Sequence, residues 1–212
     1  MTEPRGLFSS LLASGQTRIG QIEIRQAEAE FVLCHRDDVG ADALRDYPSV
    51  DAWEIARFDD AGNYRPLKTA PNLRHGWRVV ARDLTEMERV IEAIYPGRLA
   101  ILRIWESGQL ETTSWHKTLQ RQSGMYRVAA RISAAQSDQL IGTFCRSQGG
   151  CLRTILWNGD ESGGCPSTEL PKEKYDPDCD QTGRAQVAIP LLCQEPCNLL
   201  VAAARKLVKG EP

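Results

Sequence analysis

The distribution of cysteine constrains this chain more than any other sequence feature. One of the seven cysteines stands alone at position 34, and the other six fall in the last third of the chain: Cys145, Cys151, Cys165, Cys179, Cys193 and Cys197. The N-terminal apolar patch is too short and too polar for a secretory leader, so we expect a cytoplasmic protein. Disulfides are rare in that reducing compartment, and clustered cysteines there indicate metal binding or redox chemistry.

Length and composition are those of an ordinary globular protein. The 212 residues suffice for one large or two small domains, and 42% of them are hydrophobic and 25% charged. A net charge of −2 argues against non-specific nucleic-acid binding. No apolar stretch approaches the roughly 20 residues that span a bilayer. We therefore expect a soluble protein with neither a nucleic-acid nor a membrane partner.

Residue patterning predicts an α+β fold in two parts. The first part, residues 1–71, is expected to be a small β-rich domain. The second, residues 72–212, is expected to be an α+β domain that carries a cysteine-rich lobe. Short apolar or alternating runs predict strands over residues 17–24, 30–33, 53–58, 77–81, 99–105 and 125–133.

Helix ends give clearer signals than strand runs. Asp83 and Glu86 fit a capping box at the start of a helix that Tyr95-Pro96-Gly97 ends. Ser133 can cap a second helix that closes at Gly142. The segment 160–183 is rich in glycine, proline and acids, which predicts a long loop. A final helix is expected to open at Pro196 and to end near Lys206, Lys209 and Gly210.

Four of the cysteines form two closely spaced pairs. Cys145 and Cys151 are six positions apart with a glycine pair between them, and Cys193 and Cys197 are four apart. A [4Fe-4S] cluster needs four thiolates that converge on one inorganic body. Cys197 is expected in the first turn of the final helix, where the positive helix end stabilises a thiolate. The sequence therefore predicts one [4Fe-4S] cluster held by these four cysteines.

The sequence also allows other roles for the cysteines. Structural zinc also uses four thiolates, although the spacing of the first pair exceeds that of most zinc pairs. The chain has no Cys-x-x-Cys motif, which disfavours a thioredoxin-like site. Cys165 and Cys179 are solvated thiols in the long loop unless one of them replaces Cys145 or Cys151 as a ligand. Cys34 is expected to be a small buried hydrophobe.

The remaining polar residues identify no catalytic site. His35, His75 and His116 are scattered without metal-ligand spacing, so each is expected to be structural. No phosphate-binding or nucleophile motif is present, which leaves open whether the protein is an enzyme. Several arginines near the cluster could receive an anionic substrate, such as a carboxylated tetrapyrrole, or an acidic electron carrier. We favour a solvated face for them: Arg121, Arg127, Arg131, Arg146 and Arg153.

The cysteine spacing resembles the cluster motif of sirohaem-dependent sulfite and nitrite reductases, but their sirohaem-binding regions are not found here. A wider resemblance covers the chain from about His75. It rests on His75-Gly76-Trp77-Arg78, Tyr95-Pro96-Gly97, residues 121–127, Cys151-Leu152-Arg153 with Trp157, and Cys193 to Cys197. These phrases resemble the uncharacterised 4Fe-4S cluster-binding domain family, which is also found fused to cobaltochelatase-like (CbiX-type) domains of tetrapyrrole metabolism.

The resemblance carries several expectations. It implies cluster ligation at Cys145, Cys151, Cys193 and Cys197, and a small stabilising domain at the N-terminus. No chelatase domain fits beside these elements in 212 residues, so the iron–sulfur half is expected alone. The expected function is electron transfer or redox support in tetrapyrrole or cobalamin metabolism, with a redox partner protein and an anionic tetrapyrrole or chelatase-like partner. The alternatives are a zinc-stabilised interaction module and a cluster-dependent enzyme that acts on an anionic substrate.

Overall fold

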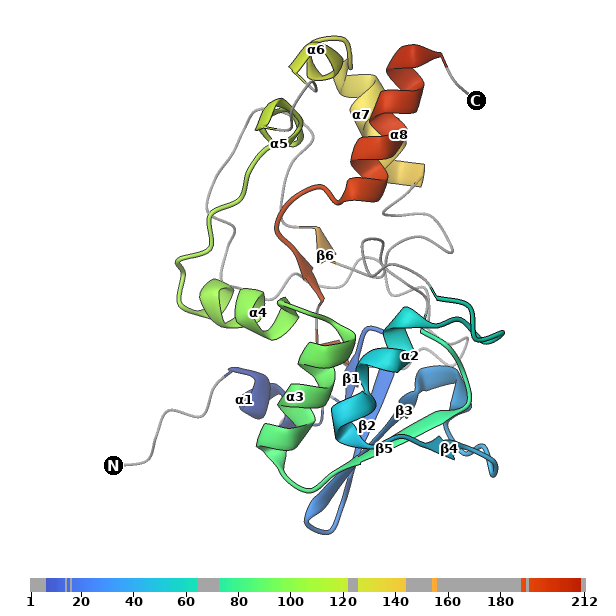
Figure 1. Ribbon diagram of the computed structural model, residues 1–212. Helices are drawn as coiled ribbons and strands as arrows, with labels where there is room; N and C mark the ends of the chain where they lie inside the picture. The colour runs from blue at the N-terminus through green and yellow to red at the C-terminus, as the bar shows by residue number, and fades with distance from the viewer. Residues whose placement is uncertain are drawn as a thin grey trace, which may run out of the picture. The chain divides into compact units, whose positions relative to one another are not determined.

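The protein combines a mixed β-sheet with a separate group of helices, as a computed structural model shows (Figure 1). The structure describes residues 7–13, 15, 17–64, 73–121, 126–143, 154–155, 188–189 and 191–210. The chain divides into two compact units. The first comprises Met1–Leu67, Pro71–Arg103 and Cys179–Leu191, and the second comprises Lys68–Ala70, Ile104–Asp178 and Leu192–Pro212. The α+β fold class is thereby confirmed, whereas the predicted boundary at Pro71 falls outside the described residues.

The first unit is built around a mixed sheet whose strands run in the order β4-β5-β3-β2-β1-β7. The four central strands, β5, β3, β2 and β1, pair antiparallel, and the two outer strands β4 and β7 each pair parallel with their neighbours. The elements of this unit are α1 (Leu7–Ala13), β1 (Arg18–Ile19), β2 (Ile22–Ala27), β3 (Glu30–His35), η1 (Arg36–Asp38), β4 (Arg45–Asp46), η2 (Ser49–Asp51), α2 (Trp53–Arg57), β5 (Trp77–Ala81), α3 (Leu84–Ile94) and β7 (Ala188–Ile189).

Alternation along the central strands creates the buried face of this sheet. Ile24, Leu33 and Val79 lie side by side on neighbouring strands, and each is at most 2% exposed. Helices α2 and α3 lie together over one face of the sheet (Figure 1). The buried side chains of α3 recur at helical spacing, as the sequence predicts: Met87, Val90, Ile91 and Ile94.

The start of α3 is capped from two sides. Asp83 Oδ1 accepts a hydrogen bond from Glu86 N at 2.8 Å, which is half of the predicted capping box. The Glu86 carboxylate accepts instead from Arg82 N and Arg82 Nε, both at 2.9 Å, and from Ser49 Oγ at 2.6 Å. The Arg82 guanidinium, followed by the Ser49 hydroxyl, holds the pKa of Glu86 at about 2.

The described part of the second unit is mainly helical. Its elements are α5 (Trp115–Arg121), α6 (Tyr126–Ala129), α7 (Ala134–Ile141), β6 (Thr154–Ile155), β8 (Leu192–Cys193) and α8 (Asn198–Lys209), while α4 (Arg98–Glu106) spans the passage from the first unit to the second. Helices α7 and α8 lie side by side (Figure 1). Ser133 caps α7 and Gly210 ends α8, both as predicted; the structure adds that Gln136 completes a capping box with Ser133 and that Gly210 is left-handed.

Three of the predicted strands are helices. Residues 53–58 contain α2, residues 99–105 lie in α4, and the run from residue 125 to 133 contains α6 followed by a turn. In α4 the buried side chains Leu99, Leu102 and Trp105 recur every third residue and form one helical stripe. Short apolar runs do not distinguish a strand from a buried helix, because the partner surface makes that choice. No helix of the described residues is long and apolar enough to cross a membrane.

Candidate iron–sulfur centre

The two C-terminal cysteines lie on either side of a short loop that leads into α8. Cys193 is the last residue of β8, and Cys197 is the N-cap of α8. The sequence placed Cys197 within the first helical turn, but its extended backbone (φ −79°, ψ 166°) makes Asn198 the first helical residue. The unpaired N–H groups of that turn and the positive end of the helix dipole favour negative charge near Cys197.

Both thiols contact a hydrophobic core and remain partly exposed to solvent. Cys193 and Cys197 are half-buried and pack against the hydrophobic core of the second unit. Both are free cysteines, and Cys193 Sγ donates a hydrogen bond to Glu195 O at 3.3 Å. Thiols that are free, partly exposed and held by a rigid core have the properties that a metal ligand needs.

The loop between these cysteines is tied to the rest of the second unit. Gln194 Nε2 donates a hydrogen bond to Glu111 O at 2.9 Å, and Pro196 is buried. The core beneath the loop consists of residues from α5, α7, α8 and the turn before α7: Trp115, Leu119, Ile132, Leu140, Ile141, Leu200, Val201 and Ala204. The loop that carries the pair is therefore held at several points along its length.

A parallel strand pair brings a distant part of the sequence to Cys193. Strand β6 pairs with β8 so that Thr154 lies opposite Leu192 and Ile155 opposite Cys193. Thr154 follows Cys151 by three residues in the sequence. The described residues just after the first cysteine pair thus lie beside the second pair.

The other cysteines are placed differently. Cys145 and Cys151, the remaining predicted ligands, lie outside the described residues, as do Cys165 and Cys179. Cys34 is 6% exposed in the first unit, which confirms that it is a buried small side chain. Burial raises the pKa of the Cys34 thiol, so this cysteine is kept in its neutral form.

The arginines expected near the centre are exposed where they are described. Arg121, Arg127 and Arg131 all lie on the surface of the second unit, while Arg146 and Arg153 fall outside the described residues. Trp105 is 1% exposed, as expected for a core residue, and Trp157 is not among the described residues.

Comparison with known proteins assigns the chain to a class. Residues 107–206 match the family model of the 4Fe-4S iron-sulfur cluster binding domain, and this stretch contains α5, α6, α7, most of α8 and both cysteine pairs. The chain is therefore an iron–sulfur protein. Residues 6–104 match the model of the DR2241 stabilising domain. The two matches, a DR2241 stabilising domain followed by a 4Fe-4S cluster binding domain, confirm the resemblance seen in the sequence.

A solved structure is similar to nearly the whole chain. It is DR2241 from Deinococcus radiodurans, described as a multi-domain protein with structural similarity to chelatases and with two additional novel domains. The two proteins are 26% identical, with a TM-score of 0.68, and the match covers 95% of this chain and 41% of DR2241. The chain thus spans less than half of that protein. No curated protein matches the chain.

The cofactor of this family is a [4Fe-4S] cluster, as the sequence predicts. The donors present agree with it, because Cys193 and Cys197 offer two free thiols and Cys197 is the N-cap of a helix. Thiolate sulfur is the ligand that iron–sulfur clusters use, and nearby helix N–H groups offset the negative charge of the ligands.

Proposed function

We propose that Cys145, Cys151, Cys193 and Cys197 hold one [4Fe-4S] cluster, and that the protein transfers electrons to a partner protein of tetrapyrrole or cobalamin metabolism. The observation that carries the ligand set is the pairing of β6 with β8. Cys151 is three residues from Thr154, and three residues of chain span at most about 11 Å. Thr154 lies opposite Leu192, the neighbour of Cys193.

The other end of the segment that carries the first cysteine pair supports the same ligand set. The structure describes α7 and the residues after it as far as Thr143, and Cys145 follows two residues later. Leu140 and Ile141 of α7 belong to the same hydrophobic core as Leu200 and Val201 of α8. Both ends of this segment therefore start from elements that pack with Cys193 and Cys197.

Electron transfer is the activity that this arrangement supports best. A [4Fe-4S] cluster takes up and releases single electrons, and its potential responds to hydrogen bonds and to solvent exposure. The described residues hold Cys193 and Cys197 on a braced loop, which limits movement when the charge of the site changes. The proposed compartment is the cytoplasm, where thiols stay reduced. The chelatase similarity of DR2241 supports a chelatase-like partner and an anionic tetrapyrrole as the substrate of that partner.

The first experiment establishes the cofactor and its redox activity in the full chain. Protein purified without oxygen should be brown, contain iron and acid-labile sulfide in similar amounts, and bleach reversibly with dithionite. A colourless protein that contains zinc would favour the interaction module instead. A cluster that loses iron whenever it is reduced would rule out electron transfer.

The second experiment assigns the ligands. Serine replacement at Cys145, Cys151, Cys193 or Cys197 should abolish or strongly deplete the cluster, whereas Cys34→Ala should retain it. Serine replacement of each of the two remaining cysteines tests the alternative set: Cys165 and Cys179. Loss of the cluster in the Cys165 variant, with retention in the Cys145 variant, would show that the proposed ligand set is wrong.

The third experiment tests the redox partner. The reduced protein is mixed with a chelatase-like protein that carries an oxidised metal tetrapyrrole as electron acceptor and, separately, with a small artificial one-electron acceptor. Reoxidation by the partner at a rate that saturates with partner concentration supports a docked electron-transfer complex. Reoxidation by the artificial acceptor alone would remove the proposed partner while leaving the cluster intact.

A further inference from the structure

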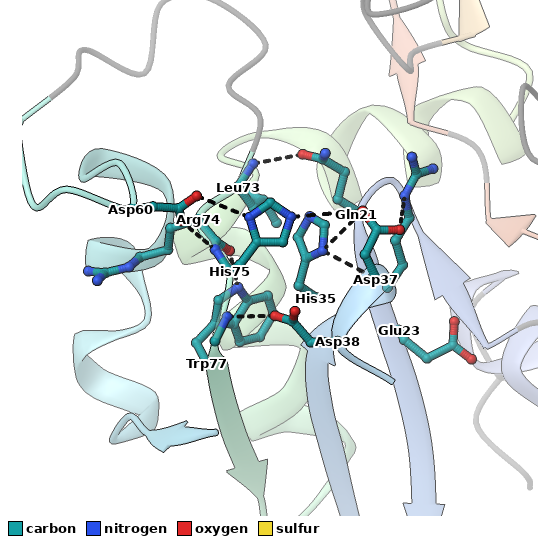
Figure 2. Close-up of polar contacts among 12 residues, drawn as sticks. Gln21, Glu23, His35, Asp37, Asp38, Asp60, Leu73, Arg74, His75 and Trp77 are labelled. Carbon is teal, nitrogen blue, oxygen red and sulfur yellow. Dashed lines mark hydrogen bonds and ion pairs between the residues drawn. The ribbon is translucent and has the colours of Figure 1, made fainter. Parts of the chain in front are cut away.

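Two histidines that are distant in the sequence meet at the end of the first unit's sheet. His35 is the last residue of β3, and His75 lies just before β5. Because β3 and β5 are antiparallel, with Cys34 opposite Arg78, the end of one strand adjoins the start of the other. The two ring centroids are 4.2 Å apart. Figure 2 shows the His75 ring between Asp60 on one side and His35 on the other.

Asp37, in the short helix η1 that follows β3, completes a group of three donors. Its Oδ2 lies 3.6 Å from His35 Nδ1 and 3.9 Å from His75 Nε2. One donor atom from each of the three residues lies within 4.8 Å of the others. Two ligands of one tetrahedral zinc ion, each about 2.1 Å from it, are roughly 3.4 Å apart. The two separations from Asp37 Oδ2 are slightly longer than that value, so these donors would have to approach by a few tenths of an ångström to share one ion.

The Asp60 carboxylate orients His75 from the side of the ring that faces away from His35. Its Nδ1 lies 3.1 Å from Asp60 Oδ2, and its backbone N donates to Asp60 Oδ1 at 2.7 Å. This contact fixes the proton on Nδ1 and directs the Nε2 lone pair away from Asp60, toward Asp37. Metal-bound histidines in proteins are typically held in this way by a carboxylate on the other ring nitrogen.

His35 offers a buried ring that is kept neutral. Its side chain is fully buried, and this burial, followed by the nearby His75, lowers the pKa of the ring. His35 Nδ1 accepts a hydrogen bond from Asp37 N at 3.2 Å, which leaves the ring proton on Nε2, and Nε2 has no partner among the described residues. Binding of a metal ion at Nδ1 would replace this hydrogen bond. A buried ring N–H without a partner is unfavourable and uncommon, so the position of this ring needs a reason beyond packing.

Neighbouring residues hold the three donors together and place negative charge around them. Asp38 Oδ2 accepts a hydrogen bond from Gly76 N at 2.6 Å, which ties η1 to the start of β5. Asp38 and Asp60 add two carboxylates near the histidines. One positive charge partly offsets them, because Arg36 Nε lies 3.5 Å from Asp37 Oδ1. The side chain of Asp37 is 59% exposed and that of His75 is 50% exposed, so an ion can reach the group from solvent.

We propose that His35, Asp37 and His75 bind one divalent first-row transition-metal ion, with Asp60 as the residue that positions His75. Two imidazole nitrogens and one carboxylate oxygen are a donor set that zinc and its neighbours favour over magnesium or calcium. Three protein ligands leave a fourth position for water or another small ligand. The site uses none of the cysteines and does not rest on the proposed electron transfer.

The test uses the full, cluster-loaded chain without oxygen, so that the cysteines are already occupied by iron. Zn²⁺ binding is measured by isothermal titration calorimetry, and the iron content is checked before and after. The wild-type protein should bind about one equivalent of Zn²⁺ more than His75→Gln. Asp37→Asn should also lose this site, and Asp60→Asn should weaken it by roughly 10- to 100-fold.

Two matched variants control for binding to unrelated surface groups. His116→Gln removes a histidine and Asp42→Asn removes an exposed carboxylate, both outside the proposed site. Both should bind Zn²⁺ like the wild type. The proposal fails if the wild type binds no more Zn²⁺ than His75→Gln, or if the controls lose as much binding as the site variants. His75 and Asp37 are exposed enough that replacing them should leave the fold intact, which circular dichroism verifies.

Discussion

Shortening Leu200 should loosen the helix that carries one of the proposed cluster ligands. Leu200 is fully buried on α8, three residues after Cys197, and it belongs to the core against which Cys193 and Cys197 pack. Its neighbour Leu199 is 39% exposed on the same helix. Leu200→Ala and Leu199→Ala remove the same atoms, so a comparison of the two isolates the effect of burial.

The expected magnitude follows from the burial of each side chain. Leucine to alanine removes three carbon groups, each worth about 0.8 kcal/mol when it is fully buried, or about 2.4 kcal/mol together. The cavity that remains in a packed core raises the loss at Leu200 to about 3–5 kcal/mol. At Leu199 no cavity forms and part of the side chain is already in water, so the loss should stay below about 1.5 kcal/mol.

Hydrogen exchange of the α8 amides, followed by mass spectrometry on the cluster-loaded protein, measures this difference. A loss of about 3 kcal/mol corresponds to roughly 100-fold faster exchange when the helix recloses faster than an open amide exchanges. Iron release to a chelator should accelerate in the same variant, because Cys197 begins the loosened helix. Leu199→Ala should change both rates by less than about 15-fold.

Two outcomes would refute this reasoning. Equal exchange rates in the two variants would mean that the described packing around Leu200 is not the packing of the protein in solution. Faster α8 exchange without any faster iron release would mean that the stability of α8 does not control the hold of Cys197 on the cluster.

Three further perturbations test the first unit and the helix caps. Gly20→Ala should lower the melting temperature, because Gly20 has φ +58° and an added Cβ would meet Leu191 and lie 2.8 Å from Tyr95 Oη. Glu86→Gln should remove stability that the wild type holds above pH 4.5, the ordinary pKa of this carboxyl, and loses as the pH falls toward about 2; thermal melts across this range will show it. Ser133→Ala should cost about 1 kcal/mol in urea unfolding, because it removes the cap of α7.

Two of these perturbations have a matched control variant, and the third has a contradicting outcome in the wild type. Gly40→Ala shares the positive φ of Gly20 but meets open space, so an equal loss there would attribute the effect to backbone strain alone. Ser133→Asp keeps a side-chain acceptor at the N-cap and should be close to the wild type. A wild-type melting temperature that stays flat as the pH falls from 4.5 toward 2 would contradict the role given to the Arg82–Glu86 contact.

The elements that could be predicted correctly are those with local causes. Asp83 and Ser133 each cap the helix that follows them, and Gly210 ends α8, because a cap depends on residues within one turn. The apolar run from Trp77 to Ala81 also predicts β5 correctly. By contrast, α4 and α6 were predicted as strands, because their short apolar runs take a conformation that depends on the surface they pack against.

The cysteine centre and the histidine group differ in the same way. The sequence by itself determined the cofactor class, because each cysteine pair lies within one short stretch and its spacing is visible without a fold. Only the tertiary structure brought His35, Asp37 and His75 together, through the antiparallel register of β3 and β5. That register is set by which side chains are buried across the whole sheet, and no local pattern around either histidine encodes it.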